Sequence, residues 1–298
     1  MRIPNNSISQ TLVSQLQTLT SQQSRLQSQA ATGQRITNAS DDPAAMGRVL
    51  DLQSEKQQIQ QFGKNTDRAL ALTQTSFSAV SQLKKLSDRA GELAILGSGV
   101  SGPQAASAYG AETNQVLEET LKVANSSYNG EHIFAGTKTD VPPYSATRDA
   151  SGNITAITYN GAAAGAAFNT SEGAAISPFT TGTDNQNFAD FANNLVSLRD
   201  SLNTNNNVGV QAAQVGLQTT EDRILSTVSN IGAIQSRFET DSVQNASRYA
   251  QLDKLTSASA DADLSETIVK LTQAKTSYQA ALQSGAKFLE LSLMDYVR

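Results

Sequence analysis

Apolar residues near the N-terminus recur with the spacing of a coiled-coil seam. From Ser9 onward, leucines fall at multiples of seven positions, with further apolar residues three or four positions away. The other faces carry glutamine, serine and threonine, so charge pairing adds little, and a lone helix of this kind is marginal in water. We predict an N-terminal coiled-coil helix within residues 1–42, with the seam Leu12, Leu16, Leu19, Leu26 and Ala30.

The C-terminal segment, residues 258–298, carries a similar stripe. Its apolar residues step by threes and fours, or by their sum, and Lys275, Gly285 and Ser292 are weak members. We expect this helix to pair with the N-terminal one. Periodicity alone leaves open that both helices pack separately on the middle of the chain. The predicted seam is Leu264, Ile268, Leu271, Tyr278, Leu282 and Leu289.

Longer helical patterns fill most of the middle of the chain. One runs from Val49 to Leu86, and a shorter one from Gln104 to Asn125. No proline follows Pro178, which suits continuous helix in the C-terminal third. We predict a helical rod domain in two parts, 43–135 and 191–257. The second part carries apolar residues on a seven-residue lattice at Leu217, Ile224, Ile231, Phe238 and Leu252.

The pattern changes between about Gly136 and Gly182, where short β-favouring pieces such as "NITAITYN" stand among glycine, alanine and threonine. We predict an inserted β-rich lobe over residues 136–190. Because helical tracts flank it on both sides, the chain must leave the bundle and return. The expected fold is mainly α: an elongated helical bundle with paired N- and C-terminal coiled-coil helices and a small inserted β-rich lobe.

Two acidic segments resemble helix starts. In "SDDPAA", Asp42 stands where an N-cap residue belongs and Pro43 at the first helical position. In "DADLSE", Asp263 and Glu266 have the spacing of a capping box. A carboxylate pair for acid and base chemistry at Asp41 and Asp42 would need companion groups that the sequence does not place nearby. We therefore predict helix-capping roles.

Composition removes several classes of function. The net charge is −5 and no cluster of lysine and arginine exists, so nucleic acid is not an expected partner. No stretch approaches the roughly 20 apolar residues that span a bilayer, and the first residues lack the apolar core of a secretory signal. We expect no membrane insertion, and a protein that is either cytosolic or exported by another route.

Candidate catalytic and metal-binding chemistry is sparse. The chain has no cysteine and one histidine, so disulfides and thiolate sites are excluded and any histidine-dependent triad or zinc site would rely on His132. His132 follows a predicted turn at Asn129 and Gly130, where a structural role is the simpler interpretation. No lysine followed by serine or threonine accompanies Gly161 and Gly165, as a phosphate loop requires. We expect no enzyme activity and no cofactor.

Three segments together resemble one family. They are "TGQRITNASDDPAAMGR" from Thr32, "NGEHIFAGTKTDVPPY" from Asn129 and "YQAALQSGAKFLELSLMDYV" from Tyr278. In this order they resemble the flagellin superfamily, and more closely the hook-associated proteins of the hook-filament junction. The final "LMDYVR" keeps the aspartate and aromatic residue of junction proteins, whereas flagellins tend to end on two leucines and an arginine.

The resemblance implies a secreted, non-enzymatic subunit that is exported unfolded through the flagellar type III apparatus. Such proteins form a ring between an adjacent hook-associated protein and flagellin. The alternatives are a short flagellin that forms the filament itself, or a glycan-binding flagellar subunit. We expect both seams to serve self-assembly and to be frayed beforehand. An export chaperone is expected to bind the apolar tail residues Phe288, Leu289, Leu291 and Leu293.

Overall fold

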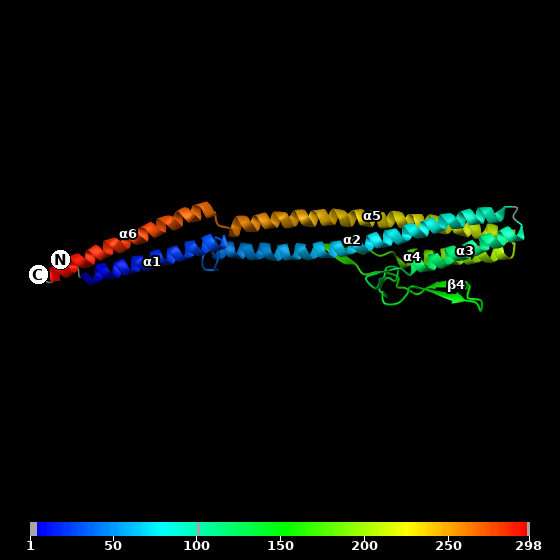
Figure 1. Ribbon diagram of the computed structural model, residues 1–298, viewed down its shortest axis with the longest axis horizontal. Helices are drawn as coiled ribbons and strands as arrows, with labels where there is room; N and C mark the ends of the chain where they lie inside the picture. The colour runs from blue at the N-terminus through cyan, green and yellow to red at the C-terminus, as the bar shows by residue number, and fades with distance from the viewer. Residues whose placement is uncertain (1–4, 100–101, 297–298) are drawn as a thin grey trace. The chain divides into compact units, whose positions relative to one another are not determined.

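The computed structural model describes residues 5–99 and 102–296, with side chains described from 10 to 99 and from 102 to 287. It confirms the mainly α fold class, with paired terminal helices and a small β-rich insertion (Figure 1). The helices are α1 (Asn5–Thr32), α2 (Pro43–Ser98), α3 (Pro103–Ala124), α4 (Gly182–Asn203), α5 (Asn207–Ala260) and α6 (Leu264–Tyr296).

The strands form antiparallel hairpins rather than one sheet. The predicted turn at Asn129 and Gly130 joins the first pair, and both residues have the positive φ angles that such a turn requires. Within the described residues, β3 pairs only with β4 and β5 only with β6. The strands are β1 (Ser127–Tyr128), β2 (Glu131–His132), β3 (Tyr144–Arg148), β4 (Ile154–Tyr159), β5 (Phe168–Ser171) and β6 (Ala174–Ile176).

The chain divides into two compact units. We call residues 1–58 with 248–298 the terminal unit, and residues 59–247 the central unit. Helices α2 and α5 contribute to both. Helix α4 begins at Gly182, inside the range predicted for the lobe, because Thr181 and Asp184 form a capping box that starts a helix there.

Small and hydroxylated residues form most of the buried face of α2 in the central unit. In the helical pattern predicted up to Leu86, Leu70, Phe77 and Leu86 are only half-buried. Small side chains let neighbouring helices approach closely. Threonine is tolerated on such a face because its hydroxyl bonds to its own helix, as Thr73 does to the carbonyl of Ala69 at 2.8 Å. The buried positions are Thr66, Ala69, Leu72, Thr73, Ser76, Ala79, Val80, Leu83, Ser87, Ala90, Leu93, Ala94 and Gly97.

The seven-residue lattice predicted along α5 is confirmed, since all five of its apolar members are buried. The lattice also passes through Asn245, which is buried and donates its side-chain amide to the carbonyl of Thr170 in β5 at 3.0 Å. The sequence interpretation missed the break between α4 and α5. Asn205, in the asparagine-rich stretch there, has a φ angle of 50°, which asparagine tolerates better than most residues.

The central unit holds a large hydrophobic core. Phe134, which lies between β2 and β3, meets Phe188 of α4 edge to face, with ring centroids 5.4 Å apart. Leu93 of α2, Leu117 of α3 and Leu195 of α4 are fully buried in the same core. The core therefore draws its side chains from helices that are distant in the sequence.

Two asparagines attach the β3–β4 hairpin to the helices of the central unit. The side chain of Asn125, at the end of α3, exchanges two hydrogen bonds with the backbone of Tyr144 in β3. Asn193 of α4 does the same with the backbone of Ile157 in β4. A two-stranded hairpin is marginal by itself, and these amides occupy backbone groups on its open edges. The hairpin is thereby fixed against α3 and α4.

Candidate assembly surface and polar pocket

Asp42 caps α2 in the terminal unit. Its Oδ1 accepts a hydrogen bond from the backbone N–H of Ala45 at 3.0 Å, the contact expected of an N-cap residue, and Pro43 begins the helix. This backbone hydrogen bond lowers the pKa of Asp42, and the neighbouring Arg35 contributes further. The carboxylate thus stays charged at the positive end of the helix dipole.

The connection between α1 and α2 is hydrogen-bonded to the connection between α5 and α6. The backbone N–H of Arg35 donates to the carbonyl of Ala260 at 2.7 Å, and that of Ala262 donates to the carbonyl of Gly33 at 2.8 Å. Asp41 holds the first connection in shape by accepting from the backbone N–H of Asn38 at 3.0 Å. These bonds place the end of α1 beside the start of α6.

Asp263 and Glu266 do not form the reciprocal capping box that the sequence predicts. Asp263 caps α6 by accepting from the backbone N–H groups of Ser265 and Glu266. The side chain of Glu266 instead forms an ion pair with Lys270, one helical turn away, at 2.8 Å. A glutamate four positions before a lysine favours this surface pair. The predicted role of Glu266 as a reciprocal cap is therefore wrong.

Helix α1 packs on α6 through the predicted N-terminal seam. Leu26 is buried, while Leu12, Leu16, Leu19 and Ala30 are half-buried. A Cβ atom placed on Gly285 would lie 2.5 Å from Leu12 Cδ2, so the absence of a side chain at Gly285 makes room for that leucine. The pairing of the terminal helices that the sequence predicts is confirmed.

On α6 the face toward α1 is rotated from the predicted seam. Leu271 and Tyr278 are half-buried, and Thr267 and Ala274 beside them are buried. In contrast, Leu264, Ile268 and Leu282 are 48, 55 and 44% exposed. The prediction that these three residues pack on α1 is wrong, because the buried positions of α6 are Thr267, Ala274 and Gly285, the last of which lies beside Leu12 of α1.

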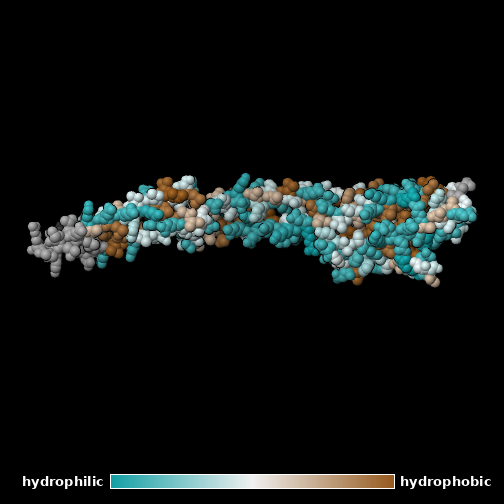
Figure 2. Space-filling model, viewed as in Figure 1, coloured by the Kyte–Doolittle hydropathy of each residue, from teal (hydrophilic) through white to brown (hydrophobic). Residues whose placement is uncertain are grey.

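The three residues Leu264, Ile268 and Leu282 form what we call the exposed α6 stripe. Figure 2 shows hydrophobic surface over the first turns of α6, where Val269 is exposed as well. Leu289 of the predicted seam and the tail residues Phe288, Leu291 and Leu293 lie beyond the described side chains. A role for that tail in chaperone binding stays a prediction.

A groove accompanies α1 in the terminal unit. Its volume is about 790 Å³, and Val13 on its wall is 53% exposed. The wall is formed by α1 from Val13 to Ser28 and by residues Thr37, Asn38 and Asp41 of the connection to α2. The groove is therefore apolar at the Val13 and Leu16 end and polar at the other.

The remaining sequence candidates have structural roles or none. His132 Nδ1 lies 2.9 Å from the carbonyl oxygen of Asn125, and its backbone N–H donates to Thr139, so it stabilises a turn. Within residues 5–99 and 102–296, no cluster of three or more histidine, cysteine, aspartate or glutamate residues could hold a metal ion. None of the helices in that part of the chain is long and apolar enough to cross a membrane.

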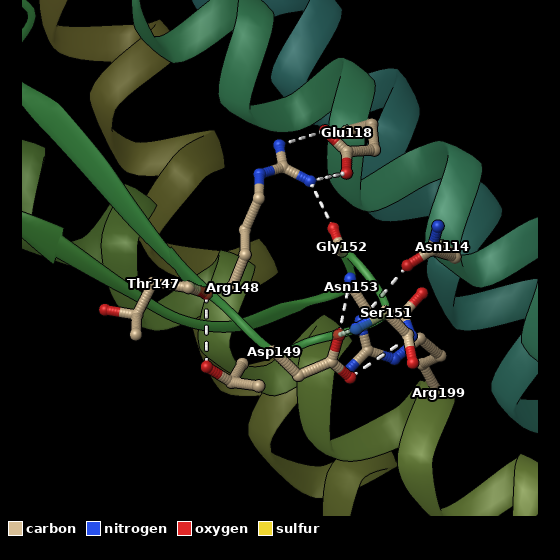
Figure 3. A network of polar contacts seen from close by, with 10 residues as sticks. Asn114, Glu118, Thr147, Arg148, Asp149, Ser151, Gly152, Asn153 and Arg199 are labelled. Atoms are coloured by element: carbon tan, nitrogen blue, oxygen red, sulfur yellow. Dashed lines mark hydrogen bonds and ion pairs between the residues drawn. The ribbon is translucent and has the colours of Figure 1, made fainter.

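A polar network joins the β3–β4 turn to α3 in the central unit (Figure 3). Arg148 makes a two-pronged ion pair with Glu118, at 2.6 and 2.8 Å, and donates to the carbonyl of Gly152 at 2.8 Å. The hydrogen bond from Arg148 lowers the pKa of Glu118. Beside this pair, Arg199 of α4 is buried and donates to Asn114 Oδ1 at 3.1 Å.

Comparisons with known proteins find similarity to flagellar proteins. Residues 3–139 match the model of the bacterial flagellin N-terminal helical region. Flagellar hook-associated protein 3 of Salmonella typhimurium is 29% identical over 122 residues, which are 40% of this chain and 38% of that protein. The flagellar filament 41 kDa core protein of Borreliella burgdorferi is 28% identical over 114 residues, 38% of this chain and 34% of that protein. The matched segment thus spans less than half of either relative.

A solved structure extends the comparison over more of the chain. The crystal structure of FlgL from Bacillus cereus has the same fold, with a TM-score of 0.59 and 17% identity. The alignment covers 70% of this chain and 99% of that one. The family match covers the motif at Thr32 and most of the motif at Asn129. The N-terminal part of the chain is thus similar to flagellin and hook-associated proteins, and its fold resembles that of FlgL.

Proposed function

We propose that this chain is a structural adapter subunit at the hook-filament junction of the bacterial flagellum. The observation that carries the proposal is the incomplete burial of the terminal unit, in which α6 leaves the exposed α6 stripe uncovered after pairing with α1. Neighbouring subunits in a ring would cover it. The adapter joins an adjacent hook-associated protein on one side to flagellin on the other.

Folding of the terminal helices is coupled to assembly in this proposal. Among the described seam side chains of α1 and α6, only Leu26 is buried, and beside the α6 seam only Thr267 and Ala274 are. A helix pair with so little buried surface gains little free energy against the entropy of ordering its chain. Contacts with a second subunit bury further apolar area, at roughly 25 cal/mol per Å². The helices are then ordered in the ring and frayed in the monomer.

The groove on α1 and the exposed α6 stripe are suited to meet between subunits. The stripe presents leucine and isoleucine, and the groove offers Val13 and Leu16 at one end. Helices dock into grooves through apolar residues at such spacing. A repeated contact of this kind, from one subunit to the next, closes into a ring when the rotation between subunits allows.

The export route follows from the same features. A chain without cysteine forms no disulfide before secretion, and terminal helices that fold only on assembly suit passage in an unfolded state. The tail after residue 287 would then be held by an export chaperone. Deletion of residues 288–298 is expected to abolish binding of the purified chaperone, and retained binding would remove this part of the proposal.

A filament subunit is the second candidate. It is favoured by the similarity to a filament core protein of Borreliella burgdorferi, which matches nearly as much of this chain as the hook-associated protein does. Both roles use a flagellin-like fold. They differ in where the subunit sits and in how many copies assemble.

Deletion of the gene in its own organism distinguishes the two candidates. A junction adapter predicts hooks without filaments in electron micrographs and flagellin lost to the culture medium. A filament subunit predicts intact junctions with missing or altered filaments. Normal flagella in the deletion strain would contradict both.

A matched pair of variants tests the assembly surface. Ile268→Asp places a charge on the exposed α6 stripe, whereas Gln273→Asp adds the same charge at an exposed polar position of the same helix. Complementation with Ile268→Asp is expected to fail and with Gln273→Asp to succeed, although both purified monomers keep the same circular dichroism. Equal complementation by the two variants would show that the stripe has no role in assembly.

A further inference from the structure

The polar pocket of the central unit has no part in the assembly surface described above. Its volume is about 410 Å³, and its walls are α3, α4 and the turn between β3 and β4. Side-chain amides and carboxylates dominate the lining. The groups that carry the argument are Asn114, Asp149, Asn153, Arg199, Asp200 and Asn203.

Arg199 is the unusual group in this lining. Its side chain is 6% exposed, although it borders the pocket. A guanidinium carries five N–H donors. Its Nε and Nη2 contact Asp200 Oδ1 at 2.8 and 2.7 Å, and its Nη1 donates to Asn114 Oδ1 at 3.1 Å. Each of its three nitrogens thus has one partner, and one further N–H on Nη1 and one on Nη2 have no acceptor among the described residues. Because Arg199 lines the pocket, these two N–H groups can donate to a ligand there.

The charges around the pocket select the kind of partner. Two carboxylates, Asp149 and Asp200, line the same space as the single cation Arg199. An anionic ligand would be repelled by these carboxylates, and a cation would meet Arg199. A neutral ligand with hydroxyl groups avoids both costs, because each hydroxyl accepts from a guanidinium N–H and donates to a carboxylate or amide oxygen.

The β3–β4 turn, which forms one wall of the pocket, is already ordered. Asp149 Oδ1 accepts from the backbone N–H groups of Ser151 and Asn153, each at 2.9 Å, which fixes the turn (Figure 3). The ion pair between Arg148 and Glu118 ties that turn to α3. A preformed wall reduces the entropy that a ligand must overcome on binding.

We propose that this pocket binds a neutral polyhydroxylated ligand, such as a sugar residue. Hydroxyl groups of the ligand take the two open donors of Arg199 and donate to Asp200 and to the amide oxygens of Asn114 and Asn203. None of the described residues that line the pocket is aromatic, so binding depends on hydrogen bonds alone. We expect an affinity on the order of 1 mM for a single sugar. This site is independent of the proposed junction role.

Saturation-transfer NMR on the full chain tests the proposal. The probes are methyl glycosides of glucose, galactose, mannose and N-acetylglucosamine, with sodium acetate and inorganic phosphate as anionic comparators. Ala111→Trp fills the pocket from an exposed lining position, and Ala108→Trp places the same side chain on the same helix outside the lining. Asn203→Ala removes one lining amide without filling the pocket.

At least one glycoside is expected to bind saturably to the wild type and to Ala108→Trp. Ala111→Trp should abolish the signal, and Asn203→Ala should weaken the affinity severalfold. Circular dichroism confirms that each variant is folded. The proposal is overturned if no glycoside binds, if Ala111→Trp and Asn203→Ala both bind as the wild type does, or if acetate or phosphate binds in place of the sugars.

Discussion

The central and terminal units use the same helices in different ways. In the central unit, α2 and α5 join α3, α4 and the β hairpins around a core that contains Phe134, Phe188 and Phe191. In the terminal unit, within residues 10–58 and 248–287, fully buried apolar residues are few. They are Leu26, Ile36, Ala45, Val49, Leu252 and Ala274.

This difference shows how one chain combines a part with a large core and a part with a small one. Stability rises with the apolar area removed from water, and small structures bury too little of it. The central unit buries large aromatic and aliphatic side chains among its own elements. The terminal unit leaves part of its apolar surface, the exposed α6 stripe, in contact with solvent. Under the proposed function, neighbouring subunits cover this stripe.

Hydrogen exchange should give the largest difference between the units. In the purified monomer, amides of α1 and α6 should exchange at least ~100-fold faster than those of α3 and α4, which corresponds to about 3 kcal/mol in opening free energy. Assembly should slow the exchange of α1 and α6. If both terminal helices were as protected in the monomer as α3 and α4, the proposed coupling of folding to assembly would be wrong.

Truncation of buried side chains should give the second-largest difference between the units, measured as the free energy of unfolding. Phe188→Ala removes a buried aromatic ring of the central unit and should lower the free energy of unfolding by about 3–5 kcal/mol. Leu26→Ala in the terminal unit should leave that main transition unchanged within ~1 kcal/mol and impair assembly instead. Urea unfolding followed by circular dichroism measures both. An equally large loss of stability in Leu26→Ala would mean that the units unfold together.

Glycine substitutions should change stability by smaller amounts, and differently in the two units. A Cβ at Gly63 of α2, in the central unit, would meet no atom within 4 Å, so Gly63→Ala should stabilise by up to ~1 kcal/mol through helix propensity. A Cβ at Gly285 would meet Leu12, so Gly285→Ala should gain less and loosen the contact between α1 and α6. Thermal unfolding measures the first variant, and exchange protection of α6 after assembly measures the second.

The ion pair between Arg148 and Glu118 should give the smallest effect. Its side chains are 41 and 40% exposed, so its contribution to stability should stay below ~1 kcal/mol. Because the pKa of Glu118 is lowered from 4.5 by Arg148, this contribution is complete above about pH 4.5 and is lost as the pH falls through the folded-state pKa. Glu118→Gln should remove that part of the pH dependence without changing stability by more than this amount.

Sequence reasoning succeeded where large apolar residues recur in register. The lattice from Leu217 to Leu252 on α5 is buried as predicted, and the turn at Asn129 and Gly130 has its expected backbone angles. Asp42 also makes the hydrogen bond that its position before Pro43 predicts. In each case the deciding interaction is local, or repeats along one helix, so the sequence carries it directly.

The same reasoning erred where small residues face a partner. It chose Leu264, Ile268 and Leu282 on α6, but Thr267 and Ala274 are the buried residues there. It also passed over Ser76 and Thr73 of α2 and the buried Asn245 of α5. An alanine, serine or threonine gives no sign in the sequence of whether another helix approaches it. The polar pocket around Arg199 was missed because its walls come from α3, α4 and a turn between strands, which are distant from one another in the sequence.

The sequence by itself determined the long helical stretches, the cap at Asp42 and the presence of a β-rich insertion, because periodicity, proline placement and capping residues act over a few positions of the chain. The tertiary structure decided which face of α6 meets α1, which face remains exposed, and which polar side chains gather around Arg199. Those outcomes depend on how closely helices approach. That distance is set by pairs of side chains far apart in the sequence, such as Leu12 and Gly285.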